Sequence, residues 1–297
     1  MTGSLWSEAR EALLRDRLAM TCAAVLVLLA LAAIAGPSLL DYREDEIDWT
    51  HMAAPPFEAS GHWLGTDRLG RDLLVRTLHG LRVSLGIALA ATLVSLVIGV
   101  AWGSFAGFRR GRTDALMMRF VDVLYALPQV FFVIILTVVF GRGPLTILTA
   151  IGAFGWLTMA RIVRGQALAL RERDFIEAAV VGGAGTGRII TRHVVPNLLG
   201  PVIVYATLGL PQAILVESFL GFLGLSVDEP AASWGALLHE GSQELDSAPW
   251  TLLFPAGFLI ATLAAFQFLG DSLRDRLDPR RADTAPPEAT EPQAAAA

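Results

Sequence analysis

The stretch "VSLGIALAATLVSLVIGVAWGSFAGF", residues 83–108, decides the class of fold to which this chain belongs. It runs for 26 residues without a charged side chain. About 20 mostly apolar residues in a helix are enough to cross the hydrocarbon core of a bilayer, which is roughly 30 Å thick. The stretch therefore predicts a transmembrane helix.

Five further apolar runs are long enough, or nearly long enough, to cross a bilayer in the same way. The six predicted spans are residues 18–40, 83–108, 117–141, 144–161, 198–225 and 249–270. The first exceeds the roughly 7–15 apolar residues of a signal peptide, so we expect it to stay as an uncleaved span. Only 17% of the 297 residues are charged, against about 25% in soluble domains. The prediction is an all-α polytopic membrane protein with six transmembrane helices.

The arginines predict an orientation. All 23 basic residues are arginine, and 17 of them fall in inside segments if the N-terminus is cytoplasmic. We therefore expect both termini inside, with a cytoplasmic N-terminal segment (1–17), a membrane domain (18–270) and a cytoplasmic tail (271–297) that is largely disordered. Residues 41–82 form a long outside segment, and residues 161–196 form a long cytoplasmic one. No basic block of the kind that binds nucleic acid is present.

The cytoplasmic segment 161–196 is longer than a connection needs, which indicates structure or function of its own. Asp174 is placed to cap a short helix, and Glu177 would complete a capping box. Phe175, Ile176, Ala179 and Val180 would share one side of that helix. A glycine cluster at 182, 183, 185 and 187 would end it, and Thr186 would cap a second helical segment that leads to Pro196. The prediction is helix, glycine turn, helix.

The same glycines resemble the start of a phosphate-binding loop. That loop requires lysine and then Ser or Thr after its last glycine, with a strand in front. Here Arg188 and Ile189 hold those positions, the chain has no lysine, and nothing nearby alternates like a strand. We therefore predict no nucleotide binding. From the residues alone, the segment is either a lid on the helix bundle or a docking surface for a soluble partner.

Several other residues inside the predicted spans are candidates for a functional or structural role. Glu217 is an ionisable residue in an apolar run and either lines a pathway or is paired structurally. Pro128 and Pro211 would kink their helices. Arg119 and Asp122 are spaced to pair with each other. The small-residue pattern of Gly86, Gly99, Gly103 and Gly107 predicts a close helix contact, within the chain or with a partner.

No metal site is predicted from this sequence. Cys22 is the single cysteine, and the five histidines are scattered without an i,i+4 pair. No cluster of His, Asp or Ser at one membrane depth indicates a polytopic membrane enzyme. No internal repeat is visible of the kind that a self-contained secondary transporter often has.

The segment "VRGQALALRERDFIEAAVVGGAGTGRIITRHVVPNLLGPVIV" closely resembles the Glu-Ala-Ala loop of bacterial binding-protein-dependent ABC importer permeases. Glu177, Ala178, Ala179 and Gly183 fit that pattern, followed by Val195 and Pro196. The stretches "HWLGTDRLGRDLLVRTLHGLRVSL" and "SFLGFLGLSVDEPAASWGALLHEG" resemble the second, C-type permease subunit of the dipeptide/oligopeptide subfamily. The likeness covers roughly residues 60–281. Gly182 departs from it, because the family more often has a bulky apolar residue there.

The resemblance implies a type I ABC importer permease fold in which residues 177–183 form a cytoplasmic coupling helix. The implied docking residues for an ATP-binding subunit are Asp174, Phe175, Glu177, Ala178, Ala179, Gly182, Gly183 and Ala184, and the pathway or gating candidates are Glu217, Pro211 and Pro128. The chain itself would be no enzyme and would bind no cofactor, because ATP and Mg²⁺ are used by partner subunits. Its "GTDRLGRD" stretch, residues 65–72, would lie outside and suit contact with a partner protein.

The implied assembly contains a second permease, two ATP-binding subunits and a periplasmic solute-binding protein, set in the lipid of the bacterial inner membrane. The implied cargo is a di- or oligopeptide. The alternative is that the same machinery imports nickel chelates, glutathione or another small solute.

Overall fold

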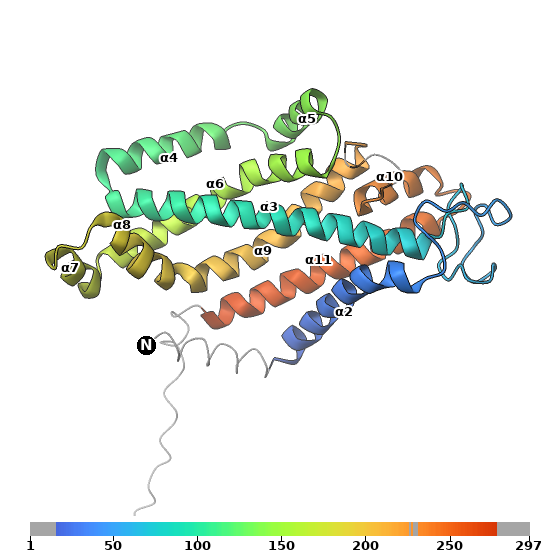
Figure 1. The fold of residues 1–297 in the computed structure, drawn as a ribbon, viewed down its shortest axis with the longest axis horizontal. Helices are drawn as coiled ribbons and strands as arrows, with labels where there is room; N and C mark the ends of the chain where they lie inside the picture. The colour runs from blue at the N-terminus through green and yellow to red at the C-terminus, as the bar shows by residue number, and fades with distance from the viewer. Residues whose placement is uncertain (1–15, 226, 228–230, 278–297) are drawn as a thin grey trace, which may run out of the picture.

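Long helices run roughly side by side along one axis of the molecule (Figure 1). The computed structural model describes residues 16–225, 227 and 231–277. In these residues no β-strand forms, and the single isolated bridge joins Thr66 to Asp72. The predictions for residues 1–15 and 278–297, which cover most of both terminal segments, lie outside the described part of the chain.

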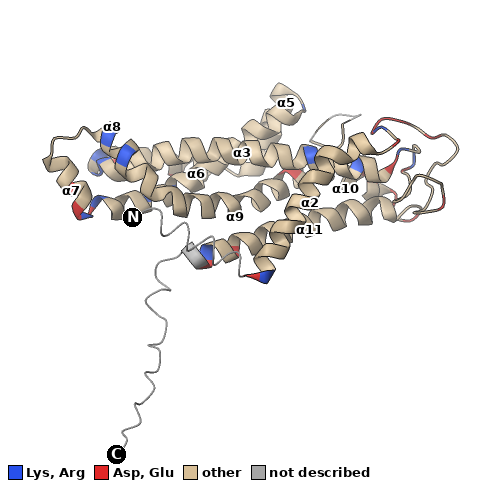
Figure 2. Cartoon of the chain, turned by 60° about the horizontal axis from the view of Figure 1, so that its bottom comes forward, with Lys and Arg blue, Asp and Glu red and all other residues tan. Residues whose placement is uncertain are grey.

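Five helices of the described residues are long and apolar enough to cross a membrane. They are α2 (Arg17–Leu39), α3 (Leu73–Arg109), α6 (Pro144–Arg171), the continuous helix Thr186–Phe222 and α11 (Trp250–Leu277). The continuous helix consists of α8 (Thr186–Ile189), a π-helical turn η1 (Ile190–Val194) and α9 (Val195–Phe222). The shorter helices are α4 (Gly111–Tyr125), α5 (Gln129–Phe140), α7 (Asp174–Val181) and α10 (Trp234–Gln243). Charged residues lie mostly toward the two ends of the bundle (Figure 2).

The third predicted span, residues 117–141, is divided between two helices. α4 and α5 form a pair bent by 75°, and only together do they pass the length and composition test for a sixth span. Pro128 stands at the break, as the residue that precedes the first turn of α5. Its ring removes a backbone donor and disfavours helical backbone at Leu127, so the helix ends there. The kink predicted at Pro128 is thus confirmed, and it is larger than a bend within a helix.

Several helices continue past the predicted ends of their apolar runs. α3 begins at Leu73, α6 continues to Arg171, and α11 continues to Leu277. The start of the predicted tail, residues 271–277, is therefore helical. Ser272 donates a hydrogen bond to Asp16 Oδ2 (2.8 Å), which joins the end of α11 to the start of α2. Polar residues lengthen these helices beyond the limit that hydropathy alone would set.

α3 and α6 pack closely along the glycine face predicted in α3. A Cβ placed on Gly99 would lie 2.7 Å from Met159 Cγ, and one on Gly107 would lie 2.9 Å from Ala167 Cβ. Gly103 lies between them, against the α6 backbone. The predicted contact is confirmed as one within this chain. Gly86 is the exception, since a Cβ there would meet no atom within 4 Å.

α10 is anchored between α3 and α9 by Trp234, which is fully buried. Its indole Nε1 donates to Thr77 O (3.1 Å), and its backbone N–H donates to Ser84 Oγ (3.1 Å). On the other side, a Cβ on Gly221 of α9 would lie 2.8 Å from Gly235 Cα. Apolar burial and close backbone approach together fix this short helix.

A buried ion network ties the loop between α2 and α3, residues 40–72, to the bundle. Arg76 Nη1 of α3 lies 2.6 Å from Asp67 Oδ2 in the loop and 2.7 Å from Glu240 Oε2 in α10. Arg71 Nε lies 2.7 Å from the same Asp67 oxygen, and its Nη2 lies 3.1 Å from Glu240 Oε2. Most of the "GTDRLGRD" stretch is therefore buried, and Arg68 is its exposed charge. The interpretation of the whole stretch as an outside contact surface is wrong for its buried residues.

The predicted pair of Arg119 with Asp122 is wrong. Asp122 Oδ1 accepts a hydrogen bond from Arg161 Nη2 of α6 (2.8 Å), whose guanidinium carbon also lies 4.1 Å from the centre of the Tyr125 ring. A second pair, Asp114 with Arg164, is bidentate, with Nη2 to Oδ2 at 2.7 Å. Both pairs hold α4 onto α6, and the carboxylate of Asp122 is used by a partner on another helix instead of by the nearby Arg119.

Candidate functional site

α7 lies at the opposite end of the molecule from the 40–72 loop, beyond the ends of α3 and α6 (Figure 1). Its eight residues include the Glu177-Ala178-Ala179 sequence. Ile176 is 1% exposed and packs in a core cluster with residues of α3, α6, α8, η1 and α9. Ala179 and Ala184 pack against the same cluster. α7 is therefore attached rigidly to the long helices rather than hanging from a loose loop.

A Schellman motif ends α7 at the glycine cluster. Ala184 N–H donates to Ala179 O (3.1 Å), and Gly183 N–H donates to Val180 O (3.0 Å). Gly183 has φ +80°, which side chains disfavour, whereas Gly182 has φ −70°. This pattern of two bonds around a left-handed glycine is the usual C-terminal cap of a helix. The predicted glycine turn is confirmed, and only Gly183 depends on being glycine.

The predicted caps at the other helix ends are wrong. Arg173, not Asp174, precedes the first turn of α7, and Gly185, not Thr186, precedes α8. Neither residue makes a side-chain capping bond. Asp174 and Glu177 both lie in the first turn of α7, where their negative charge complements the helix dipole. The predicted capping box therefore does not form at this end of α7. The two carboxylates interact there with the helix dipole instead.

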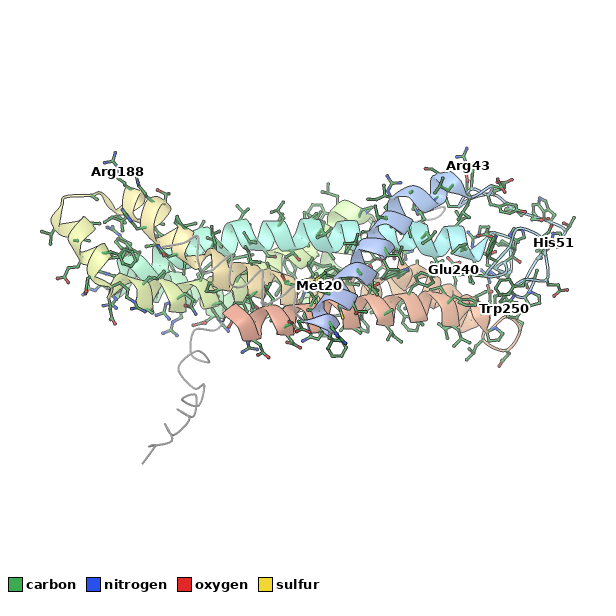
Figure 3. The ribbon with its side chains drawn as sticks, turned by 90° about the horizontal axis from the view of Figure 1, so that it is seen from below. Met20, Arg43, His51, Arg188, Glu240 and Trp250 are labelled. Atoms are coloured by element: carbon green, nitrogen blue, oxygen red, sulfur yellow. The ribbon has the colours of Figure 1, made fainter. Side chains whose placement is uncertain are left out.

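The outward surface of α7 combines apolar and acidic side chains. Phe175 is 44% exposed and Val181 is 82% exposed, so the apolar side predicted for this helix is divided between core and solvent. Asp174, Glu177 and Ala178 are also exposed. Arg188 of α8 points away from the bundle at the same end (Figure 3). Gly182 and Gly183 are exposed as well, whereas Ala179 and Ala184 are half-buried.

Alanine at the two adjacent glycines provides a prediction for this turn. Gly183→Ala should destabilise the end of α7 by about 1–2 kcal/mol, because a Cβ is disfavoured at its positive φ. Gly182→Ala is the matched control, since its φ is helical and its Cβ would meet no atom closer than 3.2 Å. Hydrogen exchange of the α7 amides in the purified chain measures the difference. Equal exchange rates in the two variants would contradict the assigned turn.

A central cavity of about 530 Å³ lies where the α4–α5 break faces α3, α6 and α9. Its polar lining residues come from four helices and include Thr92, Ser95, Gln129, Thr158 and Gln212. Leu127 and Gln129 line it on either side of Pro128. It offers hydrogen-bonding groups within helices that are otherwise apolar, an arrangement that suits a polar solute crossing a membrane.

The three pathway candidates lie around this cavity without lining it. Pro211 is buried inside α9, next to the lining residue Gln212. Glu217 is fully buried, and its Oε2 lies 3.5 Å from Ser218 Oγ. Its neighbour Val216 lines the cavity, as residues of α9 one position apart point in different directions. A role for these residues in a pathway stays a prediction.

Sequence reasoning missed the polar lining of the cavity. Thr92, Thr158 and Gln212 lie in three separate apolar runs that contain other polar residues too, so the sequence of one run does not indicate which residues of another will face it. Hydropathy of each run alone gives no signal that would group them, because only helix packing brings them together.

Comparison with known proteins identifies the family of this chain. Residues 99–283 match the family described as "Binding-protein-dependent transport system inner membrane component". The chain belongs to this family. Residues 4–56 match the "N-terminal TM domain of oligopeptide transport permease C". The chain is thus a multi-pass membrane permease of a transport family, as the Glu-Ala-Ala resemblance predicted.

Several curated relatives of this permease are similar over almost their whole length. The oligopeptide transport system permease protein OppC of Escherichia coli K12 is 51% identical over 277 residues, covering 93% of this chain and 92% of that protein. OppC of Bacillus subtilis is 45% identical, covering 93% and 90%. The dipeptide transport system permease protein DppC of Bacillus subtilis is 42% identical, covering 93% and 86%.

A solved structure confirms the fold class of this permease. An inward-facing structure of the MetNI methionine ABC transporter aligns with a TM-score of 0.55 at 20% identity. The alignment covers 69% of this chain and 96% of that chain. At this level of identity the likeness concerns the fold alone, which is that of an ABC transporter permease.

Proposed function

We propose that this permease forms half of the translocation pathway of an ATP-driven importer for di- and oligopeptides. The curated relatives with 42–51% identity are named for oligopeptide and dipeptide transport, which favours peptides over nickel chelates or glutathione as cargo. The polar lining of the central cavity supports the same cargo, because peptide N–H and C=O groups need hydrogen-bond partners away from bulk water. A second permease subunit would complete the pathway.

ATP hydrolysis resides in two separate ATP-binding subunits in this proposal, and this chain binds no cofactor. The supporting observation is α7, which exposes Phe175, Val181 and two carboxylates while Ile176 fixes it to the bundle. A rigid surface of that kind favours a role in docking over a role as a lid on the bundle. The reason is that it exposes side chains that do not pack within the bundle. The docking residues are those predicted from the sequence, between Asp174 and Ala184.

Movement of α7 would reach the pathway through continuous helix. α7 packs on the cluster that contains Ile189, Ile190 and Val194, and these residues continue directly into α9. α9 in turn supplies Tyr205, Gln212 and Val216 to the central cavity. Closure of the ATP-binding subunits shifts the permease between two states only if docking favours one of them. The rigid link from α7 to α9 supplies that coupling.

The proposed orientation places the α7 end and both termini in the cytoplasm. The 40–72 loop then faces the periplasm, where a solute-binding protein would deliver peptide, and the protein resides in the bacterial inner membrane. The distribution of arginine in the sequence supports this orientation, because 17 of the 23 arginines fall in the segments predicted to lie inside. The membrane domain over residues 18–270 stays a prediction, and α11 continues beyond it to Leu277.

Charge reversal at Glu177 tests the docking proposal. Glu177→Arg should reduce peptide uptake and co-purification of the ATP-binding subunits about tenfold or more, which corresponds to about 1.4 kcal/mol of docking free energy. Glu58→Arg reverses an exposed charge in the 40–72 loop and serves as the matched control, which should retain co-purification. Wild-type uptake and co-purification by Glu177→Arg would overturn the proposed docking role.

A further inference from the structure

Three potential metal ligands meet in the 40–72 loop, at the far end of the molecule from α7. Asp48, His51 and His62 each offer one ligand atom, and these atoms all lie within 4.8 Å of one another. His51 lies at the outermost part of this end (Figure 3), and its ring is 46% exposed. His62 is 1% exposed. The group therefore has one buried histidine and one accessible histidine on either side of a carboxylate.

His62 is held with one ring nitrogen aimed at the group. Its Nδ1 lies 2.8 Å from Asp72 Oδ2, and Tyr42 stacks on the ring with centroids 4.2 Å apart. Asp72 is itself fixed, because its Oδ1 caps α3 by accepting from Val75 N–H (2.8 Å). A carboxylate at Nδ1 holds the proton there and leaves Nε2 with a lone pair. This arrangement is the one that orients histidine ligands toward metal ions.

The second ring nitrogen of His62, Nε2, is buried beside Asp48. Nε2 makes no hydrogen bond, although Asp48 Oδ2 lies 3.5 Å away. Both atoms are acceptors when His62 carries its proton on Nδ1, so a cation between them would satisfy both.

The separations suit a tetrahedral ion. With metal–nitrogen and metal–oxygen bonds of about 2.0–2.2 Å, neighbouring ligand atoms stand about 3.4 Å apart. The 3.5 Å between His62 Nε2 and Asp48 Oδ2 matches that spacing. His51 Nδ1 lies 2.7 Å from the same oxygen, a hydrogen-bond distance, and its exposed ring has room to turn toward an ion.

We propose that Asp48, His51 and His62 form a binding site for a divalent transition-metal ion of the Zn²⁺ type, with Asp72 orienting His62. Two imidazoles and one carboxylate are ligands that Zn²⁺ accepts, and they leave a fourth position for water or for a group from a partner protein. The bound ion joins residues 48–51 of the loop to His62, and through Asp72 to the first turn of α3. It therefore fixes the loop onto the end of the bundle.

The sequence predicted no metal site because residues 48, 51 and 62 have no regular spacing. Two histidines at positions i and i+4 of a helix can be recognised from the sequence, whereas these ligands come from irregular backbone. The fold of the loop brings them together.

Titration of the metal-free chain with Zn²⁺ tests the proposal. The full chain, purified in detergent without a polyhistidine tag and stripped with a chelator, is titrated with ZnCl₂ by calorimetry. One equivalent should bind with a Kd in the micromolar range or below, and the ion should raise the unfolding temperature, because it binds only the folded loop. Co²⁺ as a spectroscopic probe should show the absorption of a tetrahedral site.

Variants locate the ion. His51→Ala removes an exposed ligand, so the fold is retained and Zn²⁺ affinity should fall at least tenfold. His62→Gln should abolish binding, and Asp72→Asn should weaken it about 10–100-fold, as expected for a group that orients a ligand. His193→Ala, at the α7 end, is the control and should bind as wild type does. Absence of saturable binding to the wild-type chain, or equal affinity in wild type and His51→Ala, would overturn the proposal.

Discussion

Arg76→Met should destabilise the folded chain by about 3–5 kcal/mol, because it removes the buried arginine that joins both carboxylates of an ion network. The Arg76 side chain is 1% exposed and bonds both Asp67 and Glu240. Methionine preserves much of the length of the Arg76 side chain but carries no charge. One arginine, Arg71, then remains for the buried carboxylate of Asp67 and the half-buried carboxylate of Glu240, and a buried charge without a partner is far costlier than an exposed one.

The control for this prediction is Arg68→Met in the same loop. The Arg68 side chain is 61% exposed and lies 3.5 Å from Glu244, so its removal should cost about 0–1 kcal/mol. Thermal unfolding of the purified full chain measures both variants, and the Arg76 variant should unfold on the order of 10 °C lower.

A second variant separates the ion network from simple packing loss. Adding Glu240→Gln to Arg76→Met removes the surplus negative charge, so the double variant should recover part of the lost stability. Equal unfolding temperatures for Arg76→Met and Arg68→Met would contradict the importance of the network, and so would a double variant whose losses simply add.

Gly103→Ala should destabilise the contact between α3 and α6 by about 1–3 kcal/mol. A Cβ on Gly103 would overlap Ala160 O and would lie 2.8 Å from Val163 Cβ and 2.9 Å from Arg164 N. Two of these atoms belong to backbone, which has no rotamer by which to move aside. The helices must therefore separate, and the well-packed residues on either side lose contact with one another.

The control for Gly103→Ala is the same substitution at another glycine of α3, Gly86. A Cβ on Gly86 meets nothing within 4 Å, so Gly86→Ala should be neutral or should stabilise α3 by up to about 1 kcal/mol through higher helix propensity. Unfolding of the two single variants in one detergent compares them directly. A Gly103→Ala variant as stable as Gly86→Ala would show that α3 and α6 are not in close contact.

The glycine turn illustrates what local sequence predicts well. Helix, turn and helix over residues 174–194 follow from the order of apolar, acidic and glycine residues, and the structure confirms them. The cap residues were predicted wrongly, because Asp174 and Thr186 suit a capping position by type but the chain enters each helix one residue earlier. Capping depends on the backbone angles of a single residue. The type of that residue constrains these angles only weakly.

Ionic partners illustrate what local sequence predicts poorly. Asp122 has a basic residue three positions away in Arg119, yet it bonds Arg161 from another helix. The same holds for Arg76, whose partner Glu240 lies far along the chain. Such partners come within reach of one another only when the helices pack, so the spacing of charges along the sequence does not reveal them.

The sequence by itself determined that this protein is a helical membrane protein, because long uncharged runs must be buried in lipid, and its Glu-Ala-Ala segment predicted the permease family that the comparisons show. It also predicted the position of the short helix α7 and the glycine cluster that ends it, and the structure then identified Gly183 as the glycine with positive φ. Only the tertiary structure decided the break between α4 and α5, the polar lining of the central cavity and the grouping of Asp48, His51 and His62. Hydropathy and helix signals are properties of neighbouring residues, whereas cavities, ion networks and ligand sets are formed by residues that are brought together by packing.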